Sequence, residues 1–186
     1  NPDVEVRVAE VIGDCDELAQ LVVDRYLAEL DAEGFGEGAP GFMSNLVLKD
    51  RDVLVVGGGA VAARRIPRLL DAGAKVRVVA PNLGIAVGRL AASGAIAVEQ
   101  RTARAEDVGE AWYVLAASND PNINAMIAAE AERRHTFCCR ADDALGGTAT
   151  TPTTASAGGL TVAVIGDRNP RRSVRVRDEL LQVLQD

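Results

Sequence analysis

The stretch from Asp52 to Ala62 reads DVLVVGGGAVA and decides the fold that the sequence predicts. An apolar run over 53–56 predicts a buried strand, three consecutive glycines predict a tight turn, and a chain with helical spacing follows. The motif has the GxGxxA form, with Gly57, Gly59 and Ala62 at its defining positions. A strand, a tight turn and a helix N-terminus together make the geometry that receives a dinucleotide pyrophosphate.

Each defining residue has a physical role in such a site. Gly57 permits the sharp turn, Gly59 lacks the Cβ that would block the phosphates, and Ala62 lets the helix pack close to the strand. The helix N-terminus then offers N–H groups and its positive dipole end to the anion. Some glycine-rich turns only allow close packing and bind no ligand. The position of this motif between a strand and a long helix is what favours dinucleotide binding.

The chain around this motif alternates between strand and helix patterns. We expect strands at 46–48, 52–57, 75–80, 95–99, 112–116 and 137–141, and helices at 60–72, 84–93 and 121–134. This order predicts an open parallel sheet with helices on both faces, the doubly wound α/β (Rossmann) fold. After it, 147–156 and 160–165 predict a β hairpin, and Asn169 and Pro170 open a terminal helix.

A separate segment precedes this domain. Residues 4–9 alternate like a strand, and Asp14 begins a helical pattern. In VEVRVAEVIGDCDELAQLVVDRY the segment resembles the closing strand and helix of the small cobalt- or iron-chelatase (CbiX-type) family, which acts on tetrapyrroles. We therefore expect residues 1–33 to be the remnant of a preceding chelatase-like domain, in a chain that is a fragment of a longer protein, and residues 34–41 to be a Gly-rich linker.

Composition narrows the classes of function. Hydrophobic residues make up 48% of the chain and aromatic residues 3%, which predicts a core of aliphatic side chains. A net charge of -7 argues against a general nucleic-acid binder, and no apolar run approaches the roughly 20 residues that a membrane span needs. Cys15, Cys138 and Cys139 are an odd count with two adjacent, which favours a reducing cytoplasm over a disulfide framework. With His135 as the single histidine and no CxxC, we expect no metal site.

Ligands of an open parallel sheet bind beyond the carboxyl ends of its strands. The candidate cofactor residues at those ends are Gly57, Gly59, Pro81, Asn82, Ser118, Asn119 and Asp120. Nicotinamide-binding folds often place an acidic residue after the second strand to hold the ribose 2′-hydroxyl, whereas this chain has Ala80, Pro81 and Asn82 there. The choice between NAD and NADP stays open on this pattern, with NAD favoured.

Asp142 is the candidate catalytic residue, because a carboxylate at a strand end faces the ligand crevice. We expect partial burial to raise its pKa toward a value useful for proton transfer. The alternative is that Asp142 and Asp143 form a solvated turn. Cys138 and Cys139 lie on a predicted buried strand, where packing is favoured over nucleophilic chemistry, and His135 is interpreted as a helix-terminal residue.

Arginines gather around the start of the terminal helix in a protein that is otherwise acidic. They are Arg168, Arg171, Arg172, Arg175 and Arg177. Bidentate guanidinium groups suit a ligand with several carboxylates, and a solvated helix face is the alternative. The candidate substrate-binding residues are Arg168, Arg171 and Arg172.

Three stretches carry a resemblance to a known family: NLVLKDRDVLVVGGGAVAARRIPRLLDAGAKVRVVAP, YVLAASNDPNINAMIAAEAERR and FCCRADDA. From about Phe42 to the C-terminus, the chain resembles the siroheme-synthase type of precorrin-2 dehydrogenase. The resemblance implies NAD-dependent oxidation of precorrin-2 to sirohydrochlorin in siroheme biosynthesis, and in some members insertion of ferrous iron. It also implies an NAD-binding Rossmann domain at 42–146 and a dimerisation region, hairpin plus helix, at 147–186, hence a homodimer.

The resemblance also implies roles for single residues. Ala60, Val61, Pro81 and Asn82 fall where the family contacts NAD. Asp142 matches the family's essential aspartate, with the expected role of accepting or relaying a proton while hydride leaves for the nicotinamide. Precorrin-2 carries several carboxylates, which gives the arginine cluster a partner.

The chain departs from the family pattern at two places. Residues 165–168 replace a serine-rich turn, and Ala144 stands near the place of a usual proline. Both departures bear more on iron insertion than on oxidation. Two other functions stay open: insertion of iron into sirohydrochlorin as the main activity, with the nucleotide fold as scaffold, and a non-catalytic Rossmann module that senses NAD.

Overall fold

The computed structural model describes residues 41–166 and 169–185. The predictions for residues 1–33 and for the linker up to residue 40 lie outside the described residues. The chain divides into two compact units, one from Gly41 to Thr151 and one that contains the described residues from Pro152 onward. Each unit has its own architecture.

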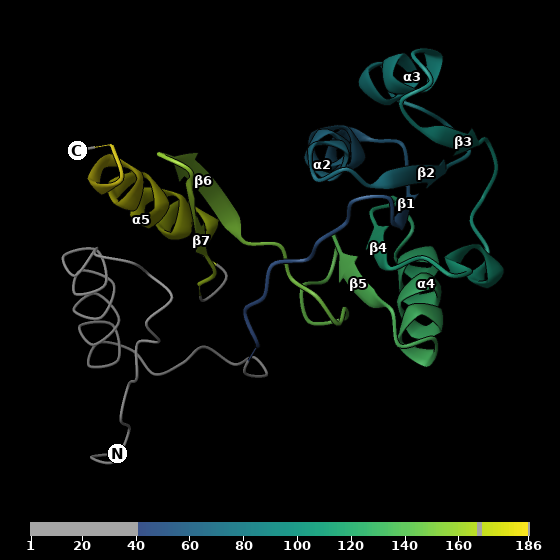
Figure 1. Ribbon diagram of the computed structural model, residues 1–186. Coiled ribbons are helices and arrows are strands. Elements are labelled where there is room, and N and C mark those ends of the chain that lie inside the picture. The colour runs from purple at the N-terminus through teal and green to yellow at the C-terminus, as the bar shows by residue number, and fades with distance from the viewer. Residues whose placement is uncertain (1–40, 167–168, 186) are drawn as a thin grey trace, which may run out of the picture. The chain divides into compact units, whose positions relative to one another are not determined.

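The first unit is built on a five-stranded parallel sheet (Figure 1). Its strands are β1 (Asp52–Val56), β2 (Lys75–Val79), β3 (Ala97–Glu99), β4 (Tyr113–Ala116) and β5 (Phe137–Arg140). They lie in the order β3-β2-β1-β4-β5, and every neighbouring pair is parallel. The strand order reverses between β1 and β4, as in a doubly wound sheet, so the predicted fold class is confirmed.

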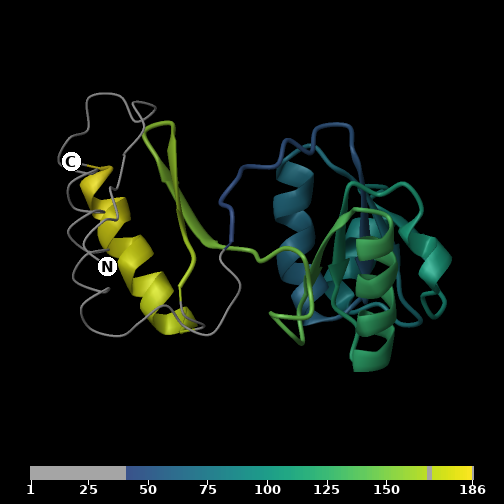
Figure 2. The ribbon, with the colours of Figure 1, turned by 90° about the horizontal axis from the view of Figure 1, so that it is seen from below.

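Helices cover both faces of this sheet (Figures 1 and 2). They are α2 (Ala60–Asp71), α3 (Ile85–Ala92), α4 (Pro121–Arg133) and the short 3₁₀ helix η1 (Ala105–Val108), which the sequence pattern did not predict. The α2 and α3 helices pack on one face with the side chains of Val53 and Val55, whereas α4 and η1 pack on the other with those of Leu54 and Val56. Because β1 is buried on both faces, its sequence is a continuous apolar run rather than an alternating one.

The strand expected over residues 46–48 is wrong. Residues 41–48 have no regular structure, and of this stretch only Leu48 is buried. The chain turns immediately before β1, where Asp50 has φ 61°, the Arg51 N–H donates to the Leu48 carbonyl, and the Asp50 N–H donates to the Gly73 carbonyl. One buried side chain anchors this turn to the core, and no neighbouring strand pairs with it.

The second unit confirms the predicted hairpin and terminal helix. Strands β6 (Thr153–Ala157) and β7 (Leu160–Val164) pair antiparallel, and α5 (Pro170–Val183) packs against both. The side chain of Asn169 caps α5 by accepting a hydrogen bond from the Arg172 N–H at 3.1 Å, and Pro170 occupies the first helical position. Among the described residues of this unit, only Leu180 is buried.

Two negative findings apply to the described residues. None of the helices there is long and apolar enough to cross a membrane. Nor do three or more His, Cys, Asp or Glu side chains gather there in a way that would hold a metal ion.

Candidate functional site

The glycine turn after β1 is packed too tightly for any other residue at its first position. Gly57 has φ 111°, and a Cβ there would lie 2.3 Å from the carbonyl oxygen of Ala117 and 2.9 Å from the amide nitrogen of Ser118. Its own N–H donates to the carbonyl of Val79 at 3.0 Å. The turn is therefore fixed between the end of β2 and the end of β4, and only glycine fits there.

The second glycine joins the turn to the segment after β2. A Cβ on Gly58 would lie 2.4 Å from the carbonyl oxygen of Asn82, and the Gly84 N–H donates to the Gly58 carbonyl at 2.9 Å. Three loops that lie far apart in the sequence thus meet at the carboxyl edge of the sheet: the glycine turn, the Pro81–Asn82 segment and the start of the Ser118–Asp120 loop. This is the edge at which doubly wound sheets bind their ligands.

The third glycine has free space around it. A Cβ on Gly59 would meet no atom within 4 Å, although both preceding glycines would clash. Gly59 is the N-cap of α2, where no side chain caps the helix, so the first N–H groups at Ala60 and Val61 lie at an uncapped helix N-terminus. Ala62, in the first turn of α2, is fully buried in the core with Val53 and Val55. Open space at an uncapped N-terminus fits the pyrophosphate of a dinucleotide.

Beyond β2, Ala80 is buried while Pro81 and Asn82 are exposed. No carboxylate follows the strand at this point. The nearest acidic side chain in the pairing register is that of Glu99 at the end of β3, and it is bound to Arg77 at 2.9 Å and to Arg101. Asn82 is exposed at the end of β2, and its predicted contact with a ribose stays a prediction.

The loop after β4 is held by its own side chains. The Ser118 hydroxyl donates to the Asp120 carbonyl at 2.9 Å and accepts from the Asp120 N–H at 3.1 Å. The Asp120 carboxylate caps α4 by accepting from the Asn122 N–H at 2.9 Å. Asn119 between them is exposed. Ser118 and Asp120 thus shape the loop, and their predicted contact with a cofactor stays a prediction.

Sequence reasoning missed Asn124. Its side chain lies on the buried face of α4, is 0% exposed, and bonds both backbone groups of Ser118: Oδ1 accepts from the N–H at 3.0 Å and Nδ2 donates to the carbonyl at 3.0 Å. The signal was present in the sequence, because Asn124 stands at helical spacing with the buried Ile127, Ala128 and Ala131. A polar residue in an apolar stripe indicates a specific partner.

Asp142 lies beside the end of β4, because Ala116 pairs with Arg140 and the Ala141 N–H donates to the Ala116 carbonyl at 2.9 Å. The expected rise of its pKa is wrong. Arg140 donates from Nη2 to the Asp142 carboxylate at 2.8 Å and holds its pKa below the usual range, with smaller contributions that include the Asn124 side chain. Burial opposes this and is outweighed, so Asp142 is ionised at neutral pH.

The neighbouring carboxylate shares the same arginine. Asp143 Oδ2 lies 3.5 Å from Arg140 Nη1, and its Oδ1 accepts from the Leu145 N–H at 3.0 Å. The Asp143 side chain therefore stabilises the turn after β5, while Asp142 is the carboxylate next to the end of β4. The solvated-turn interpretation applies to Asp143 better than to Asp142.

The other predicted residues of this unit have structural roles. Cys138 and Cys139 are buried free thiols, and burial raises the pKa of Cys138 to about 11. This agrees with packing rather than nucleophilic chemistry. His135 lies just after the end of α4 with φ 56°, which confirms a helix-terminal position.

The predicted substrate arginines belong to the second unit, and Arg168 lies outside the described residues. Arg171 is exposed at the start of α5, and Arg172 follows it. Further along α5, Arg177 is paired with Asp178 and donates from Nη1 to the Thr153 hydroxyl at 3.0 Å, which fastens the helix to β6. Substrate binding by Arg168, Arg171 and Arg172 stays a prediction.

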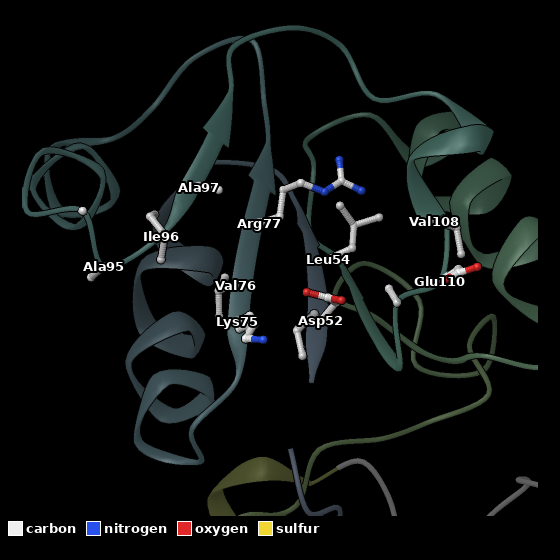
Figure 3. Close-up of a pocket in the computed structure, with 13 residues that line it drawn as sticks. Asp52, Leu54, Lys75, Val76, Arg77, Ala95, Ile96, Ala97, Val108 and Glu110 are labelled. Carbon is white, nitrogen blue, oxygen red and sulfur yellow. The ribbon is translucent and has the colours of Figure 1, made fainter. Parts of the chain in front are cut away.

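A cavity of about 480 Å³ opens elsewhere on the first unit, near the amino ends of the strands (Figure 3). Asp52 and Lys75, which begin β1 and β2, line it together with Arg77 and Glu110. Val108 of η1 and Ala111, both in the connection from β3 to β4, also line it. The cavity lies at the end of the sheet opposite to the glycine turn and is separate from the candidate site.

The chain is similar to proteins that act in siroheme synthesis. It is 42% identical over 96 residues to siroheme synthase 1 of Serratia proteamaculans, which covers 52% of this chain and 20% of that protein. It is 38% identical over 82 residues to the precorrin-2 dehydrogenase of Priestia megaterium, covering 44% of this chain and 41% of that protein. The matches thus span less than half the length of these relatives.

A solved structure agrees with these sequence relatives. The chain matches the structure of SirC, a precorrin-2 dehydrogenase, with a TM-score of 0.68 and 28% sequence identity, over 77% of this chain and 71% of that one. The family model described as putative NAD(P)-binding matches residues 45–153, which contain the whole five-stranded sheet and the glycine turn. The chain therefore belongs to the putative NAD(P)-binding family.

Proposed function

We propose that this protein catalyses the NAD-dependent oxidation of precorrin-2 to sirohydrochlorin. The observation that carries the proposal is the carboxyl edge of the sheet, where the open space at Gly59 and the ionised carboxylate of Asp142 follow strands on either side of β4. A dinucleotide site and a base at one edge suit the removal of a hydride and a proton from one substrate. We propose precorrin-2 as the substrate because similar proteins are named precorrin-2 dehydrogenase.

In this proposal the chain's own residues bind, orient and accept a proton. The α2 N-terminus at Ala60 and Val61 holds the pyrophosphate, and Asn82 bonds the adenosine ribose. When bound, NAD supplies the acceptor for the hydride. Asp142 accepts the proton, so that precorrin-2 and NAD⁺ give sirohydrochlorin, NADH and H⁺. Asp142 is deprotonated at neutral pH, as a general base must be before it acts, although its lowered pKa makes it a weaker base than the raised pKa expected from the sequence would.

The test is anaerobic incubation of the protein with precorrin-2 and NAD, following NADH absorbance and the macrocycle spectrum together. We expect one NADH for each sirohydrochlorin formed. Asp142→Asn is expected to abolish turnover while NAD still binds, because it keeps the size of the side chain and removes its basicity. Wild-type protein that binds NAD but forms no NADH would contradict the proposal and favour a nucleotide-sensing module.

We also propose that the region 147–186 forms a homodimer, next to an NAD-binding domain at 42–146, and that the protein acts in the cytoplasm, where its buried thiols stay reduced. Support for the dimer comes from β6 and β7, which form a two-stranded sheet. Such a sheet is only marginally stable by itself in water, so packing against a second copy would stabilise it. Leu160 and Ile165 are 48% and 49% exposed at the two ends of the β7 segment. Sedimentation equilibrium measures the mass: a concentration-independent monomer would contradict the dimer.

A further inference from the structure

Asn124 is one of two polar residues in the described part of the chain that are buried, and the only one with no exposed surface at all. A buried amide without partners costs free energy, and Asn124 avoids that cost by bonding the N–H and the carbonyl of one residue, Ser118. The amide orientation follows from these partners, because the Ser118 N–H needs an oxygen and its carbonyl needs a donor. The contact therefore fixes both the position and the rotation of the Ser118 peptide groups.

The residue held by Asn124 is the one that faces the glycine turn. The Ser118 nitrogen that donates to Asn124 is the atom that lies 2.9 Å from a Cβ built on Gly57, and the Ala117 carbonyl lies closer still. Ala117 and Ser118 therefore lie so close to Gly57 that no side chain fits between them, and the position of this peptide and that of the turn depend on each other. The buried amide on α4 is thus coupled through one peptide to the glycine turn.

The same side chain lies close to Asp142. The Asn124 amide is among the groups that lower the pKa of that carboxylate, and Asp142 follows β5, the strand next to β4. The amide thus stands between the loop after β4 and the loop after β5. Neither Asn119 nor Asp120, which are nearer in sequence to Ser118, has a side chain in this buried position.

We infer that Asn124 is a positioning residue of the nucleotide site, which holds the Ser118 loop against the glycine turn and beside Asp142. It acts through Ser118 and through the carboxylate of Asp142, and it is itself buried. This inference rests on the proposed function only for the measurement of turnover. The affinity for NAD tests the position of the Ser118 loop whether or not precorrin-2 is oxidised.

The experiment compares Asn124→Ala with two controls on the same helix in the full chain. Ile127→Val removes one buried methylene about one helical turn after Asn124 and lowers stability without changing the contact with Ser118. Asn122→Ala changes an exposed side chain. The capping contact with Asp120 uses only the backbone N–H of residue 122, which this variant keeps. For each variant, the Kd of NAD is measured by calorimetry, kcat with precorrin-2 by NADH formation, and stability by denaturant unfolding.

We expect Asn124→Ala to raise the Kd of NAD about tenfold or more and to lower kcat by a similar factor, whereas both controls keep both constants within about twofold. Equal effects of Asn124→Ala and Ile127→Val at matched loss of stability would overturn the inference, because Asn124 would then be structural only. Should the alanine variant fail to fold, Asn124→Asp keeps the size and one acceptor but loses the donor to the Ser118 carbonyl. An unchanged Kd in that variant would also overturn it.

The outcomes separate this inference from the proposed function. If the wild-type protein binds NAD but does not oxidise precorrin-2, the proposed function fails, and the change of Kd still decides the role of Asn124. If precorrin-2 is oxidised and Asn124→Ala behaves as Ile127→Val does, the function stands and the inference fails.

Discussion

The guanidinium of Arg140 bonds the carboxylate of Asp142 twice, from Nη2 to Oδ2 at 2.8 Å and from Nε to Oδ1 at 3.3 Å. The arginine side chain is 12% exposed and the aspartate side chain 25% exposed, so solvent screens this pair only in part. The pair keeps the carboxylate ionised and fixes its direction, the two properties that a positioned base requires.

Arg140→Gln tests this pair through the pH dependence of turnover. Arg140 lowers the pKa of Asp142, and a base acts only above its pKa, so activity is lost as pH falls through that lowered value. Without the positive charge, the pKa of Asp142 should rise, and the acid limb of kcat/KM should move to higher pH. Arg140→Lys, which keeps a charge, should move the limb less. An acid limb that stays in place in Arg140→Gln would mean that another group sets it.

Gly57→Ala and Gly59→Ala separate folding from cofactor binding within one turn. At Gly57, φ is 111° and a Cβ would lie 2.3 Å from the Ala117 oxygen, so we expect a loss of about 2 kcal/mol or more in the free energy of unfolding. At Gly59 the backbone is extended, with φ -87°, and space is open, so Gly59→Ala should unfold as the wild type does. Its methyl group enters the space assigned to the pyrophosphate.

The measurements for this pair are denaturant unfolding and the Kd of NAD. Gly59→Ala should raise the Kd about tenfold or more at unchanged stability. Tight binding of NAD by this variant would show that the pyrophosphate lies elsewhere. A fully stable Gly57→Ala would contradict the packing of the turn against Ala117.

Local sequence patterns predicted the sheet, because β1 and its glycine turn carry their own signal within a dozen residues. They failed where a contact depends on how distant elements dock. The spacing of Asn124 with the apolar residues of α4 could indicate that it is buried, but only the packing of α4 on the sheet shows that its partner is Ser118. The lowered pKa of Asp142 depends on the bend after β5, which turns its carboxylate back onto Arg140. Burial at the strand end was expected to dominate, and the ion pair outweighs it.

The short apolar run before β1 predicted a strand where the structure has a turn. Leu46 and Val47 are apolar but exposed, and only Leu48 enters the core. Three residues are too few to distinguish the alternating pattern of a strand from a turn in which one apolar side chain is buried. The positive φ of Asp50 then reverses the chain, a conformation that few non-glycine residues adopt and that the sequence did not indicate.

Cys138 should be inert toward thiol reagents in the folded protein. Its side chain is 0% exposed and its pKa is raised to about 11 by burial, so at neutral pH roughly one thiol in ten thousand is ionised. Alkylation with iodoacetamide at pH 7, followed by peptide mass spectrometry, should leave Cys138 unmodified before denaturation and modified after it. Cys138→Ala should keep kcat. Loss of kcat at retained stability would assign chemistry to this thiol.

Asp107 should stabilise the first unit in a pH-dependent way. Its carboxylate is nearly buried and accepts hydrogen bonds from Arg101 Nη1 and from the Arg104 N–H, both at 2.7 Å. Asp107→Asn weakens these charge-assisted contacts, and we expect the free energy of unfolding at pH 7 to fall by about 1 to 3 kcal/mol, with NAD affinity unchanged. Glu106→Gln, an exposed neighbour on η1, is the matched control and should lose little.

The sign of the pH dependence follows from the direction of the shift. Arg101 lowers the pKa of Asp107 in the folded state, so the stabilisation is fully present above the unfolded value of about 4 and is lost as pH falls through the lower folded value. Unfolding curves measured from pH 7 to pH 3 should therefore show a difference between the wild type and Asp107→Asn that shrinks as the pH falls below about 4. A difference that stays constant over this range would show that Asp107 contributes through its packing and neutral hydrogen bonds, and that the ion pair with Arg101 adds nothing to stability.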